Sequence, residues 1–97
     1  NYLKGVMQMR GVVTVIGKDK VGIVAGTSQK LAELKINILD VSQTIMGDYF
    51  TMMMLVDLTN ATADFEGARE QLHELGKNLG VKISIQNQEI FDTMHKL

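Results

Sequence analysis

The 97-residue sequence contains no cysteine, no proline and no tryptophan. Without cysteine, the chain can form neither disulfide bonds nor thiolate metal sites, and it has no cysteine nucleophile. No apolar run reaches the length of about 18 residues that crosses a bilayer, and the first ten residues lack the continuous apolar segment of a secretory signal. These absences predict a cytoplasmic protein with no membrane partner.

The chain also lacks a large excess of charge of either sign. Ten Lys and Arg residues against eleven Asp and Glu residues give a formal net charge of −1, with the signs interspersed. Direct nucleic-acid binding is not expected, because it would need a basic face. Hydrophobic residues make up 45% of the chain, enough for one core. We expect a single domain at 9–97 and an N-terminal extension at 1–8, because a clean strand pattern begins directly after Met9.

The stretch GKDKVGIVAG, residues 17–26, organises the chain. It follows a strand-like run at 11–16 and precedes an amphipathic helical pattern at 23–34, so it predicts a strand, a tight polar turn and the first turn of a helix. Asp19 can accept hydrogen bonds from the free N–H groups at the helix start, as an N-cap residue does. Gly22 permits backbone angles that a side chain would forbid, or the close approach of a ligand.

The first N–H groups of this helix carry partial positive charge, which suits a carboxylate or a phosphate. Lys18 and Lys20 add positive charge beside them. The stretch is not a P-loop, because no G-K-[ST] closes it, and it is not a dinucleotide fingerprint, because G-x-G-x-x-G is absent. A helix that is merely well capped explains the same spacing, so the motif leaves both interpretations open.

Hydrophobic periodicity predicts the element order β-α-β-β-α-β, followed by a short helical tail. Right-handed crossovers then place both helices on one face of a four-stranded antiparallel sheet, which is the α+β ferredoxin-like βαββαβ fold. The expected elements are strands 10–16 (central), 38–46 (half-exposed), 49–58 and 81–86 (an edge), helices 22–35 and 64–79, and the tail 89–97. The expected core consists of Val24, Leu31, Leu34, Leu39, Val41, Phe65, Leu72, Leu75 and Ile83.

Three motifs in this order resemble ACT domains. They are GKDKVGIV (17–24) after the first strand, LKINI (34–38) at the exit of the first helix, and SQT (42–44) followed by YFTM (49–52). The set is similar to small bacterial proteins made of a single ACT domain, related to the glycine cleavage system transcriptional repressor family. The resemblance covers residues 9–97 and agrees with the predicted fold.

The resemblance implies a regulatory module that binds an amino acid or another small ligand between two subunits, and therefore a homodimer. It carries ligand contacts over to the turn after the first strand and to the Asn that enters the second strand. With Lys18 beside them, the predicted ligand-binding residues are Lys18, Asp19, Lys20, Val21, Gly22, Ile23 and Asn37. Asn37 could instead only satisfy the backbone at the helix end. No catalytic or DNA-binding domain is attached in this sequence, so the regulated partner is not indicated.

No catalytic, metal-binding or cofactor-binding residues are expected. His73 and His95 lack partners at the spacing that metal binding or nucleophilic catalysis needs, and Glu70 and Glu74 are expected on a solvated helix face. Alternation along a strand sends Met53 opposite to Met52 and Met54, so this run fills a core and does not bind a soft metal.

Two other functions remain open. A protein–protein interaction module with a vestigial ligand site would show the same motifs. Acylphosphatases share the element order and length, but they need an Arg in the turn after the first strand, where this chain offers Lys18 and Lys20 without the bidentate fork of Arg. The homodimer contact is expected on the sheet face opposite the helices or at the edge of strand 38–46.

Overall fold

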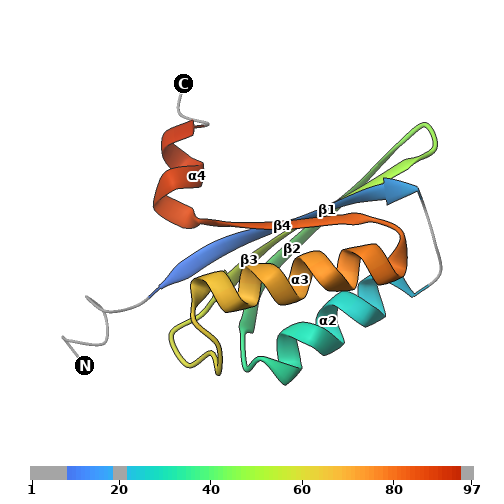
Figure 1. The fold of residues 1–97 in the computed structure, drawn as a ribbon. Helices are drawn as coiled ribbons and strands as arrows, with labels where there is room; N and C mark the ends of the chain where they lie inside the picture. The colour runs from blue at the N-terminus through green and yellow to red at the C-terminus, as the bar shows by residue number, and fades with distance from the viewer. Residues whose placement is uncertain (1–8, 19–21, 95–97) are drawn as a thin grey trace.

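The computed structural model describes residues 9–18 and 22–94. Its elements are β1 (Arg10–Lys18), α2 (Ile23–Glu33), β2 (Asn37–Met46), β3 (Tyr49–Asp57), α3 (Phe65–Leu79), β4 (Lys82–Asn87) and α4 (Gln88–Met94). The strands form one antiparallel sheet in the order β2-β3-β1-β4. Helices α2 and α3 cover one face, and α4 stands on the other (Figure 1). The predicted ferredoxin-like βαββαβ fold, with β1 central and β4 at an edge, is confirmed.

Helix α3 begins and ends where the sequence predicted. The side chain of Asp64 accepts a hydrogen bond from the Gly67 N–H at 2.7 Å, which satisfies a free donor of the first turn. Gly80 ends the helix in the left-handed region, with φ 75°. By contrast, α2 ends two residues before the predicted end at residue 35. Helix α2 ends at Glu33, Lys35 takes the left-handed φ of 58°, and Asn37 is the first residue of β2.

The core lies between the sheet and the two helices. One face of β3 contributes Phe50, Met52, Met54 and Val56, and the neighbouring face of β1 contributes Val13 and Val15. The helices contribute Leu31, Leu34, Ala68 and Leu72, and β4 contributes Ile83 and Ile85. Four of the predicted core residues are therefore buried, namely Leu31, Leu34, Leu72 and Ile83. Phe65 and Leu75 are partly buried against this cluster, which also agrees with the prediction.

Three predicted core residues are not buried. Val24, Leu39 and Val41 keep exposed fractions of 40%, 40% and 41%. The buried stripe of α2 begins at Ile23 and Thr27 rather than at Val24 and Ser28. Strand β2 lies at the outer edge of the sheet, and its residues are exposed apart from the half-buried Ile38. The two helices thus cover β3, β1 and β4 and leave most of β2 bare.

These exposed residues gather on one flank. Residues directly opposite each other in an antiparallel pair point to the same face, so Val41, opposite Met54, and Ile45, opposite Phe50, lie on the helix side of the sheet. On α2, Gly26 packs toward Leu79 of α3. Val24, about 200° around the helix from Gly26, therefore faces away from α3. We call Val24, Leu39, Val41 and Ile45 the α2/β2 flank.

Candidate functional site

The N-terminus of α2 lies in an exposed position, and the described residues around it supply no side-chain cap. Gly22 occupies the N-cap position with φ 93°, and in the described part of the chain no side chain accepts a hydrogen bond there. A Cβ built on Gly22 would meet nothing within 4 Å, so the space beside it is open. Helix α3, capped by Asp64, differs in this respect. Free first-turn N–H groups of a helix suit water or an anion, and the described residues offer those of α2 no side-chain acceptor.

The other turn residues have different places. Lys18 is exposed at the end of β1, opposite Tyr49. Ile23 is 2% exposed, so its side chain belongs to the core and only its backbone N–H can serve a ligand. Asp19, Lys20 and Val21 lie outside the described residues. Gly22 holds the N-cap position of α2.

Asn37 lies at the other end of the sheet. It is exposed and stands opposite Asp57, which in turn stands opposite Arg10 at the start of β1. Lys18 is at the far end of β1, the nine-residue strand that begins with Arg10. The two ends of this strand are about 26 Å apart at 3.3 Å per residue. A single chain therefore does not bring Asn37 to the turn. Both positions flank α2 in sequence, and the helix separates them in space.

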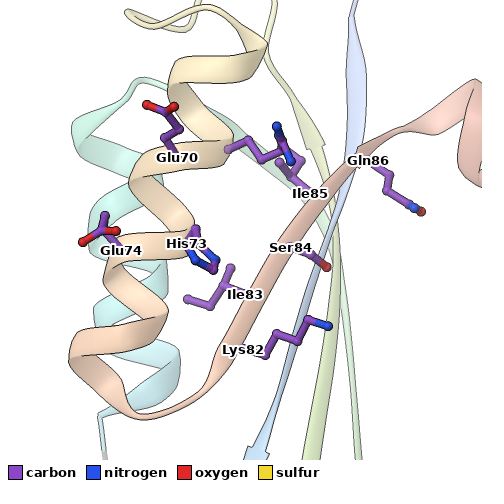
Figure 2. A pocket seen from close by; sticks show the side chains of 9 residues that line it. Glu70, His73, Glu74, Lys82, Ile83, Ser84, Ile85 and Gln86 are labelled. Atoms are coloured by element: carbon purple, nitrogen blue, oxygen red, sulfur yellow. The ribbon is translucent and has the colours of Figure 1, made fainter.

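A further hollow lies elsewhere. A groove of about 680 Å³ runs between α3 and the outer side of β4. Figure 2 shows His73 pointing from α3 toward β4, whereas Glu70 and Glu74 point away. Glu74 pairs with Lys77 at 3.3 Å on an exposed surface, a contact that contributes little to stability. Nothing in this groove positions a nucleophile against a base.

One further ion pair lies at the rim of the groove. The Arg69 guanidinium donates a hydrogen bond to a Glu66 carboxylate oxygen at 2.6 Å, and this bond, with the charge of Glu66, raises the pKa of Arg69.

Within residues 9–18 and 22–94 no three His, Asp or Glu side chains converge to hold a metal ion. Met52 and Met54 are buried on one face of β3 and Met53 is half-buried on the other, as predicted. None of the described helices is long and apolar enough to span a membrane.

The α2/β2 flank is the feature that the sequence analysis missed. Three of its residues, Val24, Leu39 and Val41, were assigned to the core because their spacing fits the periods of a helix and a strand. One signal pointed to the edge position: polar Gln43 lies between Val41 and Ile45 on the same face of β2. A covered strand face seldom carries an amide without a partner.

Comparisons with known proteins agree with this architecture. Residues 11–86 match the family model described as the ACT domain. A UPF0237 protein of Listeria monocytogenes is 62% identical over 89 residues, which are 92% of this chain and 100% of that protein. The structure of an ACT domain protein from Streptococcus pneumoniae has a TM-score of 0.77 at 49% identity, and the match covers 87% of this chain and 94% of that one.

A more distant structure bears on the repressor resemblance. It is described as a candidate glycine cleavage system transcriptional repressor, with a TM-score of 0.71 at 21% identity over 82% of this chain and 46% of that chain. At this identity the similarity concerns the fold alone. Together with the matches above, it confirms the resemblance that the sequence motifs predicted.

Proposed function

The chain belongs to the ACT domain family, and from this premise we propose that it is a regulatory module that binds an amino acid at the interface of a homodimer. The observation that carries the proposal is the open space at the N-terminus of α2 beside Gly22, for which the described residues supply no side-chain cap. Its N–H groups and the helix dipole suit the ligand carboxylate. Lys18, at the end of β1, would add positive charge. The proposal takes 9–97 as the functional unit, with 1–8 as an extension, and keeps the cytoplasmic location that the sequence predicts.

The α2/β2 flank supports the homodimer. Strand β2 pairs only with β3 in the described sheet, so its outer edge is unpaired, and unpaired edges tend to pair with another chain. Two copies related by a twofold axis would join their β2 edges in antiparallel fashion. The contact would bury Val24, Val41 and Ile45 of both subunits, which are exposed in a single chain.

The same pairing would complete the ligand site. Strand β2 runs from Asn37 to Met46, and Met46 lies in the same row as Tyr49 and Lys18. Antiparallel pairing puts the start of one β2 beside the end of the other, so the partner subunit's Asn37 would approach the turn before α2. The Asn37 amide offers both a donor and an acceptor for the polar groups of an amino acid. The two halves that lie far apart in one chain would meet across the interface.

We propose binding rather than catalysis. An acylphosphatase-type reaction needs a bidentate cation in the turn after β1, and Lys18 and Lys20 lack the guanidinium fork. Arg69, which has that fork, lies on α3 and pairs with Glu66. Hydrolysis of an acyl phosphate above the uncatalysed rate would refute this part of the proposal.

Thermal unfolding in the presence of each amino acid at millimolar concentration tests the binding function. A ligand present at about 100 times its dissociation constant adds about 2.7 kcal/mol to the free energy of unfolding, a shift that is easily measured. Gly22→Val is expected to abolish the shift, because a β-branched side chain disfavours the left-handed backbone of Gly22 and would cover the first N–H groups.

Gly80→Val is the matched control, since it places the same strain at φ 75° but at the C-terminus of α3. It should keep the ligand-dependent shift. Unchanged affinity in a folded Gly22→Val protein would place the site elsewhere. The absence of a shift with every amino acid would favour the alternative, an interaction module with a vestigial site.

A further inference from the structure

The sheet face opposite α2 and α3 is divided into two halves. Helix α4 stands over one end of this face (Figure 1). Its Phe91 lines a small cavity with Val12, Met53 and Leu55, so α4 covers the end where β1 begins. Val12 is buried there although it points away from the core. The other half, toward the β2–β3 hairpin, has no helix over it in the described structure.

The uncovered half is apolar at its centre. Ile16, Met46 and Tyr49 have exposed fractions of 44%, 71% and 55%. Met46 stands directly opposite Tyr49, and Ile16 lies one row further in, opposite Thr51. We call these three residues the hairpin-end patch. Contiguous exposed apolar side chains on a small domain mark an interaction site. This patch lies on the opposite face of the sheet from Val41 and Ile45, and its Ile16 and Tyr49 are on inner strands, away from the β2 edge of the proposed dimer contact.

The charges around the patch differ from those under α4. Exposed Lys18 stands opposite Tyr49, and exposed Lys82 stands opposite Ile16. Asp40 and Asp92 lie beside α4 at the other half, while Asp48 lies in the hairpin turn beyond the patch. Two lysines therefore border the patch on its β1–β4 side, in a chain whose net charge is −1. Its complement is an apolar surface bordered by carboxylates.

The dimensions suit a helix. The patch spans three neighbouring strands, about 10 Å at 4.8 Å per strand, which equals about two helical turns. Helix α4 already rests on the same face through Phe91, so this face accepts a helix. We propose that the hairpin-end patch docks an acidic amphipathic helix of a partner protein, with apolar residues on Ile16, Met46 and Tyr49 and carboxylates near Lys18 and Lys82.

Binding of a designed peptide tests the proposal. The probe is a peptide of about 18 residues, long enough to form a helix, with Leu at i, i+3, i+4 and i+7 repeats and Glu elsewhere. Fluorescence anisotropy should show binding that weakens with salt. The same peptide with Lys in place of Glu should bind at least about tenfold more weakly. Amide shifts in NMR spectra should be largest at the patch residues and at Thr51.

Variants then assign the contact. Met46→Glu and the double change Lys18→Glu with Lys82→Glu should each weaken binding at least about tenfold, and both alter exposed residues that the fold does not need. Lys77→Glu on α3 and Val24→Glu on the α2/β2 flank should leave peptide affinity unchanged. Because Val24→Glu also removes the proposed dimer contact, its result separates this proposal from the proposed function.

Three outcomes would overturn the proposal. One is the absence of peptide binding at millimolar concentration. Another is a set of shifts confined to the α3–β4 groove or the α2/β2 flank. The third is a protein whose mass in solution is halved by Ile16→Asp without peptide, because a second copy would then occupy the patch.

Discussion

Replacing Leu31 with alanine is expected to lower the free energy of unfolding by about 2–5 kcal/mol. Leu31 is fully buried in the central cluster between α2 and the sheet. The change removes apolar contacts and leaves a cavity that close-packed neighbours cannot fill completely. Denaturant unfolding at a fixed protein concentration measures the effect. A loss within a few tenths of a kcal/mol would refute the central position of Leu31.

Thr27→Val provides the contrast on the same helix face. Thr27 is also fully buried, and within the described structure its hydroxyl has no hydrogen-bond partner. An unpaired buried hydroxyl costs about 1–3 kcal/mol, so valine of similar shape should leave stability unchanged or raise it by about 1 kcal/mol. A clear destabilisation would mean that the hydroxyl is paired.

The double variant Val41→Asp with Ile45→Asp is expected to convert the dimer to a monomer. Each side chain is exposed in a single chain, so the subunit should still fold, but two carboxylates from each copy would lie unpaired at the contact. Light scattering at micromolar concentration should give a mass near twice 10.8 kDa for the unaltered protein and near 10.8 kDa for the variant.

Ile16→Asp is the control, because Ile16 is similarly exposed but lies on the opposite face. It should remain dimeric. Dissociation by Ile16→Asp alone would move the contact to the open face, which is the other position that the sequence left open. A monomeric unaltered protein would refute the homodimer.

Local chemistry made much of the fold predictable from the sequence. The Asp64 cap, the Gly80 stop and the Gly47 hairpin turn have the same physical cause in any context, since each is a short-range property of the backbone. The order of the elements and handedness rules then fix a four-stranded sheet with both long helices on one side.

Burial at the edge of the sheet was not predictable in the same way. Periodicity shows that Val24 lies on the apolar face of its helix and that Val41 and Ile45 share the apolar face of their strand. It does not show whether another element covers these residues. A β-bulge between Ile38 and Asp40 interrupts the alternation at the start of β2, because the extra residue Leu39 has no directly opposite residue on β3. The face of a strand is a local property, whereas its cover depends on where distant helices end.

In the candidate site, too, a local property was predictable and a long-range one was not. The sequence motif predicted the glycine at the start of α2, because the need for a left-handed backbone is local. It did not predict that Asn37 lies about 26 Å away along the sheet. The resemblance that joined these residues carries no information on which subunit supplies each one. Only the direction of β2 suggests that two copies share the site.

Mixed dimers test the shared ligand site most directly. Gly22→Val and Asn37→Ala are each expected to abolish binding of the amino acid that most stabilises the unaltered protein, since every site in either homodimer lacks one half. After subunit exchange in an equal mixture, half of the dimers carry one intact site, so calorimetry should recover about a quarter of the original capacity. A site built from both subunits would be contradicted if the mixture of two folded, dimeric variants recovered no binding capacity. Full binding by Asn37→Ala alone would also contradict it.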